Sequence, residues 1–379
     1  MSRAELLQLA YRSEDDYLQT LTRLVERESP THDKAACDAL ANVLQGELGG
    51  RGWNVVRYPL PASGDILEAR LGAEADGPNT LLLAHYDTVW PLGTLERMPI
   101  KREGEKFSGP GTVDMKAGIA AAIHAVELIR AAGMALAGNV TLLITSDEET
   151  GSHDSRELIE SLAKANDRVL VLEPGRDDGA LKTGRKGVGS FRVNMRGRSA
   201  HAGNNPADGA SALRELAHFL IFVEDLADEV AGTTVNLTTA SGGFASNVIA
   251  EEANASVDVR VLRAREGGRL EAAVRGYQPR DTRVVYAVSG GINRPPLELT
   301  EANERLYQEA QAVLAELGLK LGSAVVGGGS DGNFTSALGI ATLDGLGSVG
   351  GGPHARHEHI KVRPTLERVA LVAGLLARP

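Results

Sequence analysis

The sequence predicts an α/β fold with a mixed sheet between helices, interrupted by a smaller α+β domain. At 379 residues the chain is longer than one ordinary hydrophobic core accommodates, so two domains are expected. Its first part alternates helix-like segments with short apolar strands, which favours a parallel or mixed sheet. Residues 185–289 have the strands and helices of a compact α+β insert, so 1–184 and 290–379 are expected to form one discontinuous domain.

Composition and charge exclude several classes of protein. A hydrophobic share of 42% with 24% charged residues is typical of a soluble globular protein. The net charge of −10 argues against nucleic acid or an anionic membrane as a partner. No apolar run has the length of a membrane span or of a signal-peptide core. The single cysteine, Cys37, cannot form an internal disulfide, so we expect a reducing, cytoplasmic location.

The elements before residue 180 alternate in type along the chain. Helices are expected at 14–28, 33–48 and about 116–132, and strands at 53–58, 65–71, 80–84, 138–144 and 169–172. Ligands bind at the carboxyl ends of the strands in open α/β sheets. The residues that follow these strands are therefore the candidates for a functional site.

The strand at 80–84 is followed by His85-Tyr86-Asp87. In a His-x-Asp pattern the carboxylate can accept the ring N–H of the histidine, which fixes its tautomer and leaves the other nitrogen for a metal. Taken alone, this histidine could instead be a simple hydrogen-bonded residue at a strand end.

Carboxylates also follow two other strands. Glu148 and Glu149 come soon after the strand at 138–144, and Glu173 follows the strand at 169–172. Adjacent glutamates at a strand end point in different directions, so one could hold a metal while its neighbour acts as a general base. A solvated acidic turn is the alternative.

Asp114 follows the tight turn Gly109-Pro110-Gly111 and precedes the helix at 116–132. It is therefore expected at or next to a helix N-cap, which is a common position for aspartate. The turn is more elaborate than a cap requires. The functional interpretation is a carboxylate that bridges two metal ions.

Four ordered motifs resemble those of the co-catalytic zinc aminoacylase and carboxypeptidase family. That family includes glutamate carboxypeptidases (carboxypeptidase G), acetylornithine deacetylases and succinyl-diaminopimelate desuccinylases, and the resemblance covers nearly the whole chain. The motifs are His85-x-Asp87-Thr88-Val89, Gly109-Pro110-Gly111-x-x-Asp114-Met115-Lys116-x-Gly118, Glu148-Glu149-x-Gly151 and Glu173-Pro174.

The resemblance implies a phosphorylase/hydrolase-like catalytic domain with two Zn²⁺ per subunit, for which Co²⁺ or Mn²⁺ could substitute. Asp114 would bridge the ions, and the peptide bond after this aspartate is cis in relatives. His85 and Glu173 would complete one site, and Glu149 with a C-terminal histidine would complete the other. Glu148 would take a proton from the bridging water, leaving a hydroxide, and pass it to the leaving amine. Asp87 would assist by orienting the histidine.

Three histidines compete for the last ligand position: His354, His357 and His359. By spacing alone, His357 and His359 would share a strand face and could form a metal pair. The family pattern has a histidine after a Gly-rich turn and a glutamate four residues later, which fits His354 and Glu358. His354 is therefore the expected ligand, and the other two histidines are expected at the surface.

The insert resembles the family's ferredoxin-like lid and dimerisation domain. In that family a lid histidine, here His201, reaches into the partner subunit's site and stabilises the oxyanion. Asn247 and Arg260 match substrate-binding positions, and an arginine fork suits a free C-terminal carboxylate, although either residue could make a structural contact instead. Gly329 and Ser330 lie in a Gly-rich turn that would offer backbone N–H groups to the substrate.

These features predict a zinc hydrolase that cleaves the amide bond to a C-terminal amino acid and most resembles a glutamate carboxypeptidase. An N-acyl-amino-acid deacylase is the alternative within the family, and a catalytically silent binding protein on the same fold is the alternative outside it. A serine hydrolase is disfavoured because the Gly-x-Ser-x-Gly motif is absent. The expected partners are a small peptide or N-acyl-amino-acid substrate and a second copy of the chain.

Overall fold

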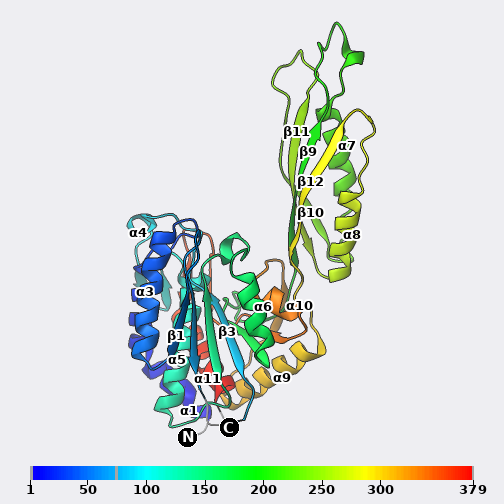
Figure 1. Cartoon of the computed structure of the whole chain (residues 1–379). Coiled ribbons are helices and arrows are strands. Elements are labelled where there is room, and N and C mark those ends of the chain that lie inside the picture. The colour runs from blue at the N-terminus through cyan, green and yellow to red at the C-terminus, as the bar shows by residue number, and fades with distance from the viewer. Residues whose placement is uncertain (1–2, 73–75, 378–379) are drawn as a thin grey trace. The chain divides into compact units, whose positions relative to one another are not determined.

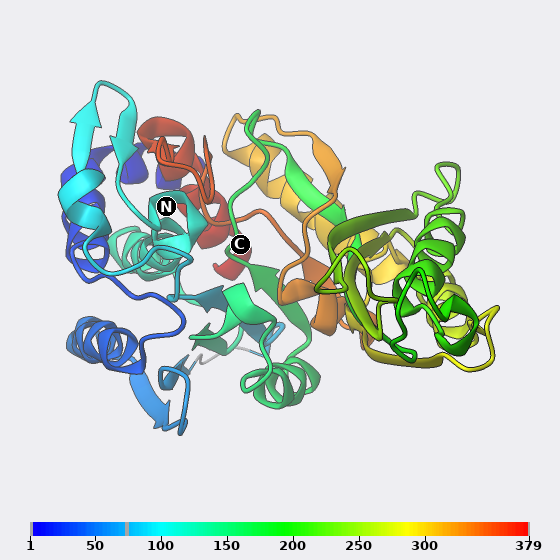
Figure 2. The same cartoon turned by 90° about the horizontal axis from the view of Figure 1, so that it is seen from above.

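The structure is a computed structural model that describes residues 3–72 and 76–377 (Figures 1 and 2). The chain divides into two compact units: unit 1 comprises Met1–Gly184, Leu299–Val325 and Ser330–Pro379, and unit 2 comprises Arg185–Glu298 and Val326–Gly329. The sequence placed the end of the insert at residue 289, which lies inside strand β12 (Val285–Arg294). Unit 2 includes the whole of that strand, which is part of its sheet, and continues to Glu298.

Unit 1 is built on a six-stranded mixed sheet. Its strands are β1 (Asn54–Tyr58), β2 (Ile66–Leu71), β3 (Thr80–His85), β6 (Val140–Thr145), β7 (Arg168–Val171) and β14 (Ala341–Leu343), in the order β1-β2-β6-β3-β7-β14. β2 is antiparallel to both of its neighbours, whereas β6, β3, β7 and β14 are mutually parallel. The predicted mixed sheet between helices is confirmed.

Helices cover both faces of this sheet. Successive strand residues point to opposite sides, and in β3 and β6 the residues on both sides are buried. Leu82 and Leu142 face a core formed with α1, α2, α3, α5, α9 and α11, whereas Leu81 and Leu143 face a second core formed with α6 and α10. The helices of unit 1 are α1 (Arg3–Arg12), α2 (Glu14–Val25), α3 (Lys34–Gly50), α4 (Thr94–Arg97), α5 (Ala117–Ala131), α6 (Arg156–Lys164), α9 (Glu301–Glu316), α10 (Gly332–Ala337) and α11 (Val362–Leu376). Figure 1 shows α5 and α6 on opposite sides of the sheet.

The parallel strands β3, β6 and β7 end at the same edge of the sheet. His85, the last residue of β3, is the register partner of Thr145 at the end of β6. Leu83 is likewise the partner of Val171 at the end of β7. The three segments that follow these strands therefore begin side by side.

Two smaller sheets bring in distant parts of unit 1. One has the order β15-β16-β5-β4, formed by β4 (Lys101–Glu103), β5 (Lys106–Ser108), β15 (Gly350–Gly351) and β16 (His359–Lys361), and the other joins β8 (Leu181–Arg185) and β13 (Ser323–Val326). In the first sheet, Ile360 of β16 is paired with Phe107 of β5. This pairing brings the histidine-rich C-terminal segment beside the turn that leads to Asp114.

Unit 2 is a βαββαβ arrangement. Its strands β9 (Gly187–Arg196), β10 (Thr234–Gly242), β11 (Glu252–Val261) and β12 form an antiparallel sheet in the order β10-β11-β9-β12, with the helices α7 (Ala212–Glu224) and α8 (Ala264–Arg275). Buried and exposed residues alternate along β9 and β11, and the buried ones pack with α7 and α8. This is the ferredoxin-like topology that the sequence predicted.

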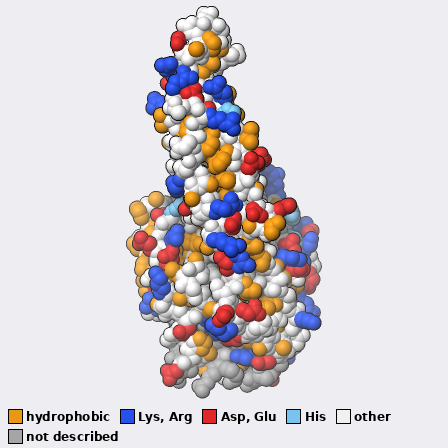
Figure 3. Space-filling model, turned by 90° about the vertical axis from the view of Figure 1, so that its right-hand side faces the viewer, with side chains coloured by type: hydrophobic (Ala, Val, Ile, Leu, Met, Phe, Trp, Pro, Cys, Tyr) orange, Lys and Arg blue, Asp and Glu red, His pale blue; other side chains and the backbone are white. Residues whose placement is uncertain are grey.

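The described surface carries charges of both signs. Figure 3 shows Lys and Arg side chains interspersed with Asp and Glu side chains on one face of the molecule. Within residues 3–72 and 76–377, no helix combines the length and the apolar character that a membrane span requires.

Candidate active site

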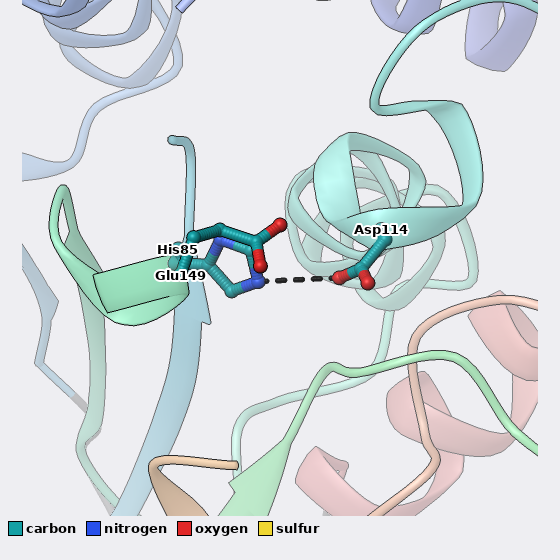
Figure 4. A group of neighbouring side chains, drawn as sticks. All are labelled: His85, Asp114 and Glu149. Carbon is teal, nitrogen blue, oxygen red and sulfur yellow. Dashed lines mark ion pairs between the residues drawn. The ribbon is translucent and has the colours of Figure 1, made fainter. Parts of the chain in front are cut away.

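Asp114 lies between two histidines. Its Oδ1 is 3.3 Å from Nε2 of His85, and its Oδ2 is 3.3 Å from Nε2 of His354. Each histidine also meets a second carboxylate: His85 Nε2 lies 3.4 Å from Glu173 Oε1, and His354 Nε2 lies 3.2 Å from Glu149 Oε2. The five predicted ligands thus form a His85 side and a His354 side that share Asp114. Figure 4 shows three of them, His85, Asp114 and Glu149, with their side chains pointing toward one another.

The ring of His85 is oriented by the residue two positions later. Its Nδ1 lies 3.0 Å from the backbone carbonyl oxygen of Asp87 and 3.3 Å from the carboxylate Oδ1. A carbonyl only accepts, so in the neutral ring the hydrogen lies on Nδ1 and Nε2 keeps a lone pair. The sequence predicted the carboxylate as the partner, whereas the carbonyl is the closer acceptor.

The buried carboxylate of Asp87 organises the turn that carries both glutamates. It accepts hydrogen bonds from the backbone N–H groups of Glu148 at 3.3 Å and Glu149 at 3.2 Å. The hydroxyl of Thr31 donates to it at 2.8 Å. Asp87 therefore couples the end of β3 to the turn after β6. Sequence reasoning missed Thr31 because it lies in a loop outside every motif.

Asp114 lies in the kinked turn Thr112–Lys116, with non-helical backbone angles of φ −123° and ψ 94°. The peptide bond between Asp114 and Met115 is cis, as the resemblance implied. Helix α5 begins at Ala117, with Lys116 at the cap position, so Asp114 is not its N-cap. The N-cap interpretation is wrong because the carboxylate faces the two histidines instead.

His354 differs from His85 in its surroundings. Its backbone has a φ of 59°, in the left-handed region, and its side chain is 51% exposed. Among the residues that the structure describes, His357 and His359 form no ion pair with a carboxylate, and His359 Nδ1 lies 2.8 Å from the carbonyl oxygen of His357. The structure therefore brings only His354 of these three to Asp114 and Glu149.

The electrostatics of this cluster favour positive charge between its carboxylates. Hydrogen bonds to Asp114 and Glu149 raise the pKa of His354 to about 10. Burial lowers the pKa of His85, but the nearby carboxylates of Asp114, Asp87 and Glu173 outweigh burial and leave that pKa raised. Burial would raise the pKa of Asp114, yet both histidines hold it well below its usual range. Burial is the main reason that the pKa of Glu149 is raised. Divalent cations would satisfy the same negative charge.

Two buried ligand atoms have no hydrogen-bond partner among the described residues: Nε2 of His85 and Oε1 of Glu149. A buried polar atom without a partner is costly, unless an ion or water completes it. Two imidazoles with three carboxylates suit zinc and similar divalent ions. The residues therefore fit a metal centre.

Glu148 begins the short turn Glu148–Thr150 and is half-buried. Its backbone is held by Asp87, and it directly precedes Glu149. Glu148 lies in the same turn as Glu149, but it is not one of the five predicted metal ligands. This is the arrangement expected of a base beside a metal site.

In unit 2, His201 and Asn247 lie in neighbouring exposed loops. The N–H of Ala202 donates to the carbonyl oxygen of Asn247 at 2.9 Å. Nδ1 of His201 accepts the N–H groups of Gly203 and Asn204, each at 3.1 Å. In the neutral ring the hydrogen therefore lies on Nε2, and the imidazole presents an N–H donor.

Arg260 is already paired in this arrangement. Its Nε and Nη2 each lie 2.9 Å from one carboxylate oxygen of Asp258, the residue two positions earlier on β11. A substrate carboxylate would have to compete with Asp258 for the guanidinium group of Arg260. Gly329 is another residue predicted to bind the substrate. Its backbone carbonyl oxygen accepts a hydrogen bond from Nη1 of Arg185 at 3.0 Å.

Ser330 is fully buried in unit 1. Its N–H donates to Asn333 Oδ1 at 2.9 Å, and its hydroxyl donates to Asp344 Oδ2 at 2.6 Å. The N–H group of Ser330 is therefore not available to a substrate in this arrangement, because it donates to the side chain of Asn333 at the start of α10.

Sequence reasoning also missed the contacts of Glu358 and Trp90. Glu358 was used only to select His354, yet its buried carboxylate contacts the Asp114 turn and the Trp90 indole. Burial raises the pKa of Glu358 to about 7. The available signal was its fixed spacing from His354.

Comparisons with known proteins identify the family of the chain. Residues 81–378 match the family model described as peptidase family M20/M25/M40. Carboxypeptidase G2 from Pseudomonas sp. (strain RS-16) is 32% identical over 383 residues, covering 98% of this chain and 91% of that protein. A succinyl-diaminopimelate desuccinylase from Cupriavidus necator is 30% identical over 362 residues, covering 90% and 93%.

Solved structures share the fold. The aminopeptidase PepT from Bacillus cereus has a TM-score of 0.81 at 20% identity, covering 96% of this chain and 98% of that chain. An M20 family metallo-carboxypeptidase from Sulfolobus solfataricus has a TM-score of 0.73 at 16% identity, covering 95% and 98%. The resemblance drawn from four motifs is confirmed: the chain belongs to the M20/M25/M40 family of metallopeptidases.

Proposed function

We propose that this metallopeptidase uses two zinc ions to hydrolyse the amide bond to a C-terminal amino acid. The observation that carries the proposal is the position of Asp114, whose two oxygens each face a different histidine. Each histidine has its own second carboxylate, so the five residues form two three-residue groups that share one member.

In this proposal His85 and Glu173 would hold one ion, Glu149 and His354 would hold the other, and Asp114 would be a ligand shared by the two groups. Co²⁺ or Mn²⁺ could replace zinc, because the same nitrogen and oxygen donors bind them. The ions would polarise the scissile carbonyl and acidify a water molecule.

The side chains around the centre supply the proton transfers. The carboxylate of Glu148 takes the proton of the attacking water and delivers it to the nitrogen of the leaving amine. Asp87 fixes the turn that carries Glu148 and holds His85 with its carbonyl oxygen, so the base and the first ligand keep one geometry.

Unit 2 is proposed to act as a lid and as the contact surface of a homodimer. The Nε2–H of the partner subunit's His201 would donate to the carbonyl oxygen as negative charge develops on it. Asn247 and Gly329 would contact the substrate, and Arg260 would exchange Asp258 for the substrate's terminal carboxylate. Ser330 would shape the pocket wall from its buried position.

The preferred substrate is proposed to be an N-acyl or peptidyl glutamate, with an N-acyl-amino-acid deacylase as the second candidate. The similarity to carboxypeptidase G2 supports the first, and the similarity to desuccinylases supports the second. A silent binding protein would have no need of both a complete ligand set and Glu148. The free thiol of Cys37 supports a cytoplasmic location.

The test combines metal analysis with a substrate panel. Purified protein should contain two zinc ions per chain and hydrolyse acyl-glutamates faster than dipeptides or acetyl-amino acids. Chelation should abolish hydrolysis, and added zinc should restore it. Faster hydrolysis of succinylated or acetylated amino acids would favour the deacylase, whereas metal binding without hydrolysis of any panel member would overturn the enzymatic proposal.

A further inference from the structure

Glu358 lies four residues after His354, and its side chain is fully buried. Its carboxylate accepts four N–H groups, two on each oxygen. Oε1 accepts the backbone N–H groups of Val113 at 2.9 Å and Asp114 at 3.2 Å. Oε2 accepts the backbone N–H of Gly111 at 3.0 Å and the indole Nε1–H of Trp90 at 2.8 Å.

The Asp114 turn converges on this carboxylate because of its backbone shape. Gly111 has a φ of 71°, in the region that favours glycine. A Cβ there would lie 2.6 Å from Cγ2 of Thr88. Backbone N–H groups that point inward in a turn form a concave site for an anion. Here the N–H groups of Gly111, Val113 and Asp114 form such a site, and the carboxylate of Glu358 fills it.

This one carboxylate joins three segments that carry candidate ligands. The carboxylate of Glu358 binds the indole N–H of Trp90, which lies in the segment that follows His85. It also binds backbone N–H groups of the Asp114 turn. Glu358 itself belongs to the same chain segment as His354. Glu358 is not one of the five proposed metal ligands. Its contact with Asp114 is made to the backbone N–H, so the ligand carboxylate stays free to face both histidines.

We propose that Glu358 is a positioning residue of the metal centre, which sets metal affinity and coordination geometry by fixing the Asp114 turn relative to His85 and His354. The inference rests on the metal centre of the proposed function. Residues that orient metal ligands typically change metal affinity or activity by 10–100-fold when they are replaced.

The main variant is Glu358→Gln, which keeps the size of the side chain. An amide has one accepting oxygen, so two of the four N–H groups would lose their acceptor and face an NH₂ group. We expect zinc affinity at both positions to fall by roughly 10–100-fold. The visible absorption spectrum of the cobalt-loaded protein should change, and at saturating zinc kcat should fall while KM stays unchanged.

Glu215→Gln is the matched control. Glu215 in α7 is also buried and accepts two backbone N–H groups, from Arg280 at 2.7 Å and Asp281 at 3.2 Å. This variant should lower Tm and leave zinc affinity and the cobalt spectrum unchanged. Trp90→Phe, which removes one of the four donors, should weaken zinc binding less than Glu358→Gln does.

A purely structural role would lower Tm alone. Equal zinc affinity and equal cobalt spectra in Glu358→Gln and Glu215→Gln would overturn the inference. If Glu358→Gln does not fold, unchanged zinc binding in both Trp90→Phe and Glu358→Asp would overturn it. Wild-type protein that binds no metal would overturn the proposed function and this inference together, whereas normal metal binding in the Glu358 variants would overturn only the inference.

Discussion

The two sides of Asp114 are built differently. His85 ends a buried strand, is 2% exposed and has its second nitrogen held by a carbonyl oxygen. His354 is 51% exposed and lies on a turn outside the main sheet. Sites on regular elements are more precisely held than sites on loops. The comparison teaches that one half of the centre is fixed by the core of the sheet and the other by local turns, so we expect the His85 side to bind metal more tightly.

The largest effect should come from a residue that belongs to neither side. Glu148→Gln should lower kcat by roughly 10²–10⁴, the usual contribution of a general base, while both ions remain bound. Metal analysis and steady-state kinetics on one preparation measure this. If turnover stays near the wild-type value, Glu148 is not the base.

Removal of one histidine should separate the two sides. His354→Ala should lose the ion of the exposed side and keep the ion of the His85 side, so the zinc content after dialysis against a weak chelator should fall by half. His357→Ala and His359→Ala are matched controls on the same segment and should keep the full content. Equal loss in all three variants would reject His354 as the ligand.

Mixed dimers test whether the active site needs the partner subunit's His201. Inactive Glu148→Ala and His201→Ala subunits, once they exchange, should regain at most roughly a quarter of wild-type activity, because random pairing in a two-fold dimer gives half of the dimers one intact site. Size-exclusion chromatography and differential tagging would verify exchange. Dead mixed dimers, or a fully active monomer, would show that His201 does not act from the partner.

The smallest effect should be a pH dependence of the metal-free protein. The pKa of His354 is raised from 6.5 to about 10 in the folded chain. A raised pKa contributes stability that is complete below pH 6.5 and is lost as the pH rises through about 10. Tm of chelated protein should therefore fall slightly from pH 7 to pH 10, by a small amount because the side chain is half-exposed. His354→Gln should flatten this trend, and an unchanged slope in that variant would contradict it.

The sequence predicted that His85 and Glu173 would lie close together, because both follow parallel strands. Apolar runs identify such strands, and parallel pairing brings their ends to one edge. His354 needed the family pattern, since spacing alone favoured His357 and His359. The ferredoxin-like insert was also predictable, because its alternating strands have one buried face.

The remaining contacts were hidden for physical reasons. Glu358 bonds to backbone N–H groups, which every residue except proline carries, so no side-chain pattern marks its partners 244–247 positions away. Asp258 sits two positions before Arg260 on the same strand face, and only the observed rotamers reveal that they pair.

The division of the chain also sets an order for biosynthesis. Unit 2 is almost continuous in sequence, from Arg185 to Glu298, and its buried face needs only its own strands and helices. Unit 1 cannot bury its sheet until α11 has been made, because that helix supplies much of the same core. During translation unit 2 can therefore fold first. At that stage His85, Asp114 and Glu173 of unit 1 have been synthesised, but His354 has not, so unit 1 is still incomplete.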